Sequence, residues 1–239
     1  MNNYFIFNNY NSKTTCGLSI EKRPRRGTPV RDVTVTHIPG RDGDLIQDNG
    51  SWNNVDITYE VGCSDIDAHI ASIRQMLASV GYQRLRDTYD PDFYRLAAVK
   101  DGAEFEEDLL NFGHAKITFT ADPYRYQVSS SNDTTITSTR SATLANPYAY
   151  KSKPLLTIFA SAGSTVTIMV NSASYLFTMP PGESVAMMDC ATETIYNMAR
   201  QSLISGYGSD SFPELAPGNN TVYQNSATSV AIAPRWRCL

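Results

Sequence analysis

The sequence lacks a long apolar segment. None of its hydrophobic runs approaches the roughly 20 residues that a transmembrane helix needs, and its first residues, MNNYFIFNNYNSK, do not follow the basic, apolar and small-residue order of a signal peptide. We therefore expect a protein that is made in the cytoplasm and does not enter a membrane. Its 239 residues, 41% of them hydrophobic, suffice to bury one large core or two small ones.

The sequence is also poor in motifs for metal binding and catalysis. Its four cysteines form no Cys-x-x-Cys pair, which argues against a zinc site and a disulfide framework and predicts buried free thiols. No serine or cysteine lies in a Gly-x-Ser-x-Gly context, and the three histidines lie near strand-like or helical runs. We predict no enzyme, no metal and no cofactor. The acidic run EFEEDL (residues 104–109) leaves a glycan hydrolase open as an alternative to a solvated hairpin face.

Charge is scarce in the second half of the chain. Residues 1–128 hold 14 of the 20 basic and 18 of the 24 acidic side chains, and the remainder is rich in Ser, Thr and Asn. The change falls at the polar run SSSNDTTITSTRSAT, which is typical of a boundary between modules. We predict two domains, residues 1–128 and residues 129–239.

The first half is predicted to be α+β. Within SDIDAHIASIRQMLASVG, apolar residues recur at the helical spacing, with Ser64 as the expected capping residue and Gly81 closing the last turn. The stripe consists of Ile66, Ile70, Ile73, Leu77 and Val80. Alternating strand-like runs surround this helix at residues 32–38, 54–61, 93–102 and 114–126, which predicts antiparallel strands around one helix.

The second half shows no helical period. Runs of four to seven apolar and β-branched residues are separated by Gly, Asn-Ser or Pro-Pro-Gly every eight to twelve residues. This spacing predicts an all-β antiparallel sandwich, with TSVAIAPRWRCL as its last strand, closed by Trp236.

A glycine- and aspartate-rich stretch, residues 36–59, is the candidate binding loop. Asp42 and Asp44 have the first spacing of an EF-hand, but Gln47 occupies the position that needs glycine, and no Walker or dinucleotide motif is present. The simplest interpretation is a long turn in which Gly40 and Gly43 adopt positive φ.

In an oligomer the same loop could reach a neighbour. We therefore nominate Arg41, with Asp42 and Asp44, as interface residues. The basic run KRPRRG adds Arg25 and Arg26, which favour an acidic protein surface over DNA.

Several stretches resemble distal tail (Dit) proteins of siphophages. IPGRDGDLIQDNGSWNN is similar to their glycine and aspartate loop, and FTADPYRY to the end of their N-terminal domain. YKSKPLLTIFASAG, MMDCATETIYN, FPELAPGNNTV and APRWRCL resemble, in order, elements of their C-terminal galectin-like sandwich. The resemblance spans nearly the whole chain.

The resemblance implies a structural virion protein of the tail tip, assembled in the host cytoplasm as a hexameric ring built from N-terminal domains. It also implies as partners the tail tube protein, the fibre or lysin hub and the tape measure protein, and possible contact with a receptor-binding protein. DNA would pass through the lumen without specific binding. The alternative is a carbohydrate-binding module that recognises host cell-wall saccharide, because such sandwiches often hold sugars and Tyr148, Tyr150, Tyr175 and Tyr207 look exposed.

Overall fold

The computed structural model describes residues 3–25, 27–101, 105–109, 112–131, 134–137 and 141–239. These residues form two compact units, one comprising residues 1–125 with Leu239 and the other residues 126–238. The described part is mostly β-strand, with one α-helix, α1 (Ile66–Leu77). No helix among the described residues has the length and apolar character needed to cross a membrane.

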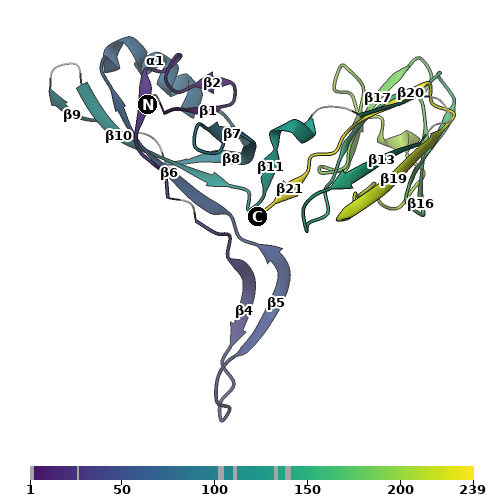
Figure 1. The fold of residues 1–239 in the computed structure, drawn as a ribbon, viewed down its shortest axis with the longest axis horizontal. Helices are drawn as coiled ribbons and strands as arrows, with labels where there is room; N and C mark the ends of the chain where they lie inside the picture. Colours follow the sequence, from purple (N-terminus) through teal and green to yellow (C-terminus); the bar gives the residue numbers. More distant parts are fainter. Residues whose placement is uncertain (1–2, 26, 102–104, 110–111, 132–133, 138–140) are drawn as a thin grey trace. The chain divides into compact units, whose positions relative to one another are not determined.

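The first unit is built on one antiparallel sheet whose strands run in the order β2-β1-β7-β8-β10-β6-β3, with β9 pairing on β10 (Figure 1). The strands are β1 (Phe5–Phe7), β2 (Tyr10–Asn11), β3 (Leu18–Lys22), β6 (Val55–Cys63), β7 (Gln83–Asp87), β8 (Phe93–Asp101), β9 (Phe105–Leu109) and β10 (Phe112–Ala121). Along β10, Ile117 and Phe119 are buried and Lys116 is exposed, because successive side chains point to opposite faces of a sheet. The sheet therefore has an apolar face for the core.

Four aromatic rings fill the centre of this core. Phe5 stacks on Tyr59 with ring centroids 4.7 Å apart, and Phe119 contacts Phe7 at 4.8 Å. Helix α1 adds Ile73 to the same cluster. Aromatic pairs of this kind stabilise a core beyond the apolar area they bury.

Helix α1 lies where the apolar period predicts it, but its ends differ from the prediction. The N-cap is Asp65 rather than Ser64, and its carboxylate accepts the N–H of Ala68. The helix ends at Leu77, so Val80 no longer follows the helical period and is 88% exposed. Met76, which the stripe omitted, is fully buried.

The second unit consists of two antiparallel sheets, in the orders β12-β20-β14-β17-β18 and β13-β19-β15-β16. The strands are β12 (Thr134–Thr137), β13 (Ser141–Asn146), β14 (Leu155–Phe159), β15 (Thr165–Val170), β16 (Ala173–Thr178), β17 (Val185–Asp189), β18 (Thr194–Tyr196), β19 (Gly218–Asn225) and β20 (Ser229–Ala233). Ile158 and Val230 of the first sheet belong to the same buried cluster as Ile168 and Phe177 of the second. The predicted sandwich is therefore present.

The end of the chain is divided differently from the prediction. Strand β20 lies inside its sheet, between β12 and β14, and Arg235 then takes a φ of 54° that breaks the run. The last strand is instead β21 (Arg237–Cys238), which pairs with β11 (Arg125–Gln127). Two short helices, η1 (Val128–Ser131) and η2 (Ile204–Gly206), complete the described elements.

Candidate assembly interface on an exposed ribbon

A two-stranded ribbon extends from the first unit, away from its sheet (Figure 1). It pairs β4 (Arg31–Thr36) with β5 (Leu45–Trp52), and the pair belongs to no larger sheet. The strand predicted at residues 32–38 exists, but its expected place beside the helix is wrong, and much of the predicted loop is strand β5. Two strands alone are marginally stable in water. We therefore expect contact with another molecule to stabilise the ribbon.

One face of the ribbon carries three apolar side chains toward its turn end, with the ion-paired Asp48 opposite Val33. Val35 lies opposite Ile46 and Val33 lies two residues before Val35, so the three side chains share a face. Val35 is 56% and Ile46 67% exposed. Alternating apolar residues normally pack against the core of their own chain. The described residues do not bury these three side chains, which remain exposed.

The other face of the ribbon is polar near its root. The amide of Asn49 donates to Thr34 Oγ1 at 3.1 Å and to Asp32 Oδ1 at 3.2 Å, and Ser51 Oγ donates to the same carboxylate at 3.0 Å. Leu45, opposite Thr36 at the turn end, is the exception. These cross-strand hydrogen bonds satisfy polar groups of this face within the chain. On the face of Val33, Val35 and Ile46, only Asp48, opposite Val33, has such a cross-strand partner among the described residues, namely Arg31.

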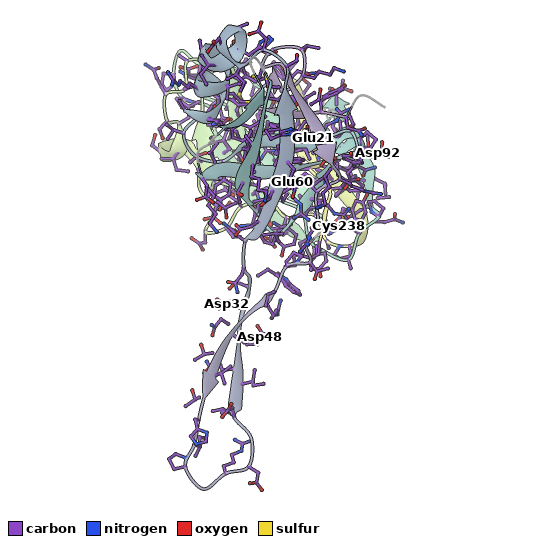
Figure 2. All side chains as sticks on the ribbon, turned by 90° about the vertical axis from the view of Figure 1, so that its left-hand side faces the viewer. Glu21, Asp32, Asp48, Glu60, Asp92 and Cys238 are labelled. Atoms are coloured by element: carbon purple, nitrogen blue, oxygen red, sulfur yellow. The ribbon has the colours of Figure 1, made fainter. Side chains whose placement is uncertain are left out.

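Charged and aromatic side chains fix the root of the ribbon. Arg31 Nε donates to both carboxylate oxygens of Asp48, at 3.0 and 2.8 Å, and its guanidinium lies 4.8 Å from the ring centroid of Trp52. The N–H of Gly50, and then Arg31, hold the pKa of Asp48 below its usual value. Figure 2 shows Asp32 and Asp48 on the ribbon, apart from Glu21 and Glu60 on the sheet.

The turn at the far end of the ribbon has the expected glycine conformation. Gly40 and Gly43 have φ of 82° and 77°, as predicted. His37 Nδ1 lies 3.1 Å from Asp44 Oδ1, so one nominated carboxylate pairs within its own turn. Arg41 and Asp42 are exposed, which leaves them accessible to another molecule.

A cavity of about 230 Å³ lies in the first unit at the root of the ribbon. Its lining includes Val55, Ile57 and Phe93, together with the segment that leads into β4. Among its arginines, Arg125 pairs with Asp90 at 3.1 Å and donates to the Leu239 carbonyl. The cavity is thus a largely apolar recess with charged groups around it.

The structure separates the two groups of predicted interface residues. Arg41, Asp42 and Asp44 lie in the turn, whereas Arg25 lines the cavity at the root. Arg26 lies outside the described residues. The apolar ribbon face was missed, although the alternation in DVTVTHI already contains its signal.

The groups considered for catalysis or metal binding are either buried or paired where they are described. Cys16, Cys63 and Cys190 are buried, and burial raises the pKa of both the Cys16 and the Cys190 thiol. His114 Nδ1 lies 2.7 Å from Glu21 Oε2. The side chains of residues 104–109 lie outside the described set. Within that set, no cluster of three or more His, Cys, Asp or Glu could hold a metal ion.

No protein-family model matches the sequence, and the search of curated proteins finds no match. Two solved structures are similar over nearly the whole chain. The SPP1 Dit protein, described as a paradigm of the hub adsorption apparatus of phages that infect Gram-positive bacteria, has a TM-score of 0.70 at 11% identity and covers 99% of each chain. A chain of the phage P2 baseplate, in its activated conformation with Ca, has a TM-score of 0.63 at 10% identity and covers 97% of each chain. The chain has a Dit-like fold, as the sequence resemblance predicted.

Proposed function

We propose that this protein is a structural component of a phage tail hub, in which six copies form a ring through their first units. The observation that carries the proposal is the apolar face of the ribbon, Val33, Val35 and Ile46, which is exposed in the single chain. Exposed apolar patches mark interaction sites. Each such side chain contributes roughly 1.5–3 kcal/mol when fully buried.

The neighbouring copy is the partner that this face fits best. In a closed ring each copy uses one surface toward one neighbour and a different surface toward the other, so each exposed ribbon meets one acceptor surface. Both similar structures come from a phage hub protein and a phage baseplate, which supports the same assignment by fold. Within the virion, the ring would join the tail tube to the fibre or lysin hub, with the tape measure protein inside and DNA passing through without specific binding.

The second unit would then be the galectin-like domain of the hub. Saccharide binding by this domain is the weaker proposal, because all four nominated tyrosines are half-buried rather than exposed. Tyr207 stacks on Phe212 at 4.6 Å, and its hydroxyl donates to the Ser211 carbonyl. Rings held in this way provide little free platform for a sugar.

Light scattering on the full chain, together with negative-stain imaging, tests the proposal. The expected mass is six times the 26.4 kDa of the chain, and the particles should have six-fold symmetry. The double variant Val35→Lys, Ile46→Lys should give folded monomers, because charges on the apolar face cannot be buried without partners. Thr34→Lys with Gln47→Lys, on the opposite face of the same strand pair, is the matched control and should keep the ring. A monomeric parent protein at tens of micromolar, about where weak assemblies dissociate, would overturn the proposal.

A further inference from the structure

The root of the ribbon contains a chemically reactive dipeptide. Asn49 and Gly50 form the one Asn-Gly pair in the sequence, and both residues are exposed in β5. An asparagine side chain can cyclise onto the amide nitrogen of the next residue, and glycine hinders this approach least because it has no Cβ. The pair is therefore a candidate for spontaneous modification.

The backbone at this pair departs from the regular ladder. The register shifts between Arg31 and Val33, so that residue 32 alone lies opposite residues 49–51. This arrangement is a β-bulge, in which the extra residues are left unpaired and the ladder is locally disrupted. Gly50 has a φ of 80°, and no atom lies within 4 Å of the place a Cβ would occupy. The bulge thus leaves space for its nitrogen to turn toward the asparagine side chain.

Both reacting groups have polar neighbours that favour cyclisation. The N–H of Gly50 donates to Asp48 Oδ1 at 2.8 Å, and a hydrogen bond to a carboxylate increases the electron density on the donor nitrogen. Thr34 Oγ1 donates to Asn49 Oδ1 at 3.3 Å, which polarises the carbonyl that the nitrogen attacks. The nucleophile and the electrophile are adjacent in the chain, and each is engaged on its reactive side.

We propose that Asn49 and Gly50 form a self-modifying site that loosens the ribbon root as the protein ages. The Gly50 nitrogen forms a bond to Asn49 Cγ and closes a succinimide ring. The Cγ–Nδ2 bond breaks, and the proton of the Gly50 N–H passes through solvent to the departing group, which leaves as ammonia. Water then opens the ring at either carbonyl, to give aspartate or isoaspartate at position 49. The net reaction is hydrolysis of one side-chain amide, with water as the only co-reactant.

The product lacks the hydrogen bonds that hold the polar face of the ribbon together. The Asn49 amide donates to Thr34 Oγ1 at 3.1 Å and to Asp32 Oδ1 at 3.2 Å, whereas an ionised carboxylate can only accept. A carboxylate at position 49 would instead face the carboxylate of Asp32, and like charges opposite each other destabilise a strand pair. Isoaspartate also adds a methylene group to the main chain of β5. A pair of strands that is marginally stable alone should therefore open at its root.

Peptide mapping of the aged full chain tests the modification. The dilute protein is incubated at mildly alkaline pH, where the amide nitrogen loses its proton more readily, and mass spectrometry with electron-transfer fragmentation follows the peptide that carries residue 49. Aspartate and isoaspartate should both accumulate there, ahead of the Asn-Ser pairs of the chain. Asn49→Gln is the control and should keep its mass, because glutamine must close a larger ring. A folded chain that keeps Asn49 intact, while the urea-unfolded chain converts, would overturn the proposal.

Hydrogen exchange of the dilute chain measures the effect on the ribbon. Asn49→Asp reproduces one of the two products and should lower the protection factors of the β4 and β5 amides at least about tenfold, because it removes hydrogen bonds and adds repulsion. The β10 amides should keep their protection. Gln47→Glu, which adds the same charge opposite Thr34 rather than beside Asp32, is the matched control. Equal protection in the two variants would overturn the link between modification and opening. Both readouts are independent of the proposed ring, so a monomeric parent chain would overturn only the ring.

Discussion

The ribbon and the central pair of the sheet, β6 with β10, are built from similar sequence but have opposite surroundings. Both are antiparallel pairs with alternating apolar residues, and only two residues separate β5 from β6. Tyr59 and Ile117 are buried in the same core cluster as Ile73 of the helix, whereas Val35 and Ile46 are exposed. The alternation of apolar residues therefore identifies the side chains that are stabilised by burial. It does not show whether the residues that bury them belong to the same chain.

The largest expected effect comes from the same substitution at two isoleucines, one buried in the core and one exposed on the ribbon. It distinguishes residues needed for folding from residues needed for assembly. Ile117→Asp would place an unpaired carboxylate in the core, at a cost of several kcal/mol, and should prevent folding. Ile46→Asp should leave the melting temperature of the protomer unchanged and abolish the ring. Thermal unfolding followed by circular dichroism, beside sedimentation velocity, measures both. Equal melting shifts for the two variants would contradict the distinction between core and interface.

The helix gives a second contrast within the first unit. Ile73→Asp should destabilise the protein by several kcal/mol because Ile73 is buried, whereas Arg74→Ala, on the exposed side, should cost under about 1 kcal/mol. Urea unfolding of both variants measures the difference. Similar midpoints would show that the buried face of α1 has been misassigned.

How far the sequence predicts the structure depends on where the partners of each residue lie. The helix, the antiparallel strands and the sandwich follow from local periodicity. The position of Gly40 and Gly43 follows from the conformations that only glycine adopts easily. The cavity, in contrast, joins residue 25 to residues 55, 93 and 125, and no local pattern connects positions so far apart.

The ribbon shows a different limit of sequence analysis. Val33 and Val35 were expected beside the helix because alternating apolar residues usually contact the core of their own chain. The assignment of Ser64 as N-cap failed for a local reason, since the neighbouring Asp65 offers an equally good oxygen and a single sequence cannot choose between adjacent capping residues.

A moderate effect is expected at the turn. Gly43 has a φ of 77° and no atom near the place a Cβ would occupy, so backbone strain rather than a clash decides the outcome. Gly43→Val should strain the turn by about 1–3 kcal/mol and weaken the ring, because β-branched residues tolerate positive φ poorly. Gly43→Asn should retain assembly. Sedimentation velocity compares the assembly of the two variants. Equal assembly would mean that the turn takes no part in the interface between copies.

A smaller effect is expected for Arg41→Glu. Arg41 is exposed in the turn, so the change should weaken the ring at low salt, more weakly at high salt, and leave the fold intact. Sedimentation at two ionic strengths, beside a melting curve, measures this. Full rings at low salt would remove Arg41 from the interface.

The smallest effect is a pH dependence at the ribbon root. Because its folded-state pKa is lowered, the Asp48 carboxylate stabilises the ribbon above the usual aspartate value of about 3.9, and this contribution is lost as the pH falls through the folded-state pKa. The protection factors of the β4 and β5 amides, which are corrected for the intrinsic pH dependence of exchange, should decrease over that range. Asp48→Asn should remove the change, and an unaltered pH profile in that variant would assign the effect to another group.

Hydrogen–deuterium exchange as a function of protein concentration tests the central claim most directly. As the chain passes from dilute monomer to ring, amides of β4 and β5 and of the turn should become protected, while those of β10 stay as slow as in the monomer. A ring that forms without any change in the ribbon would contradict the claim that its apolar face is the surface that a second copy covers.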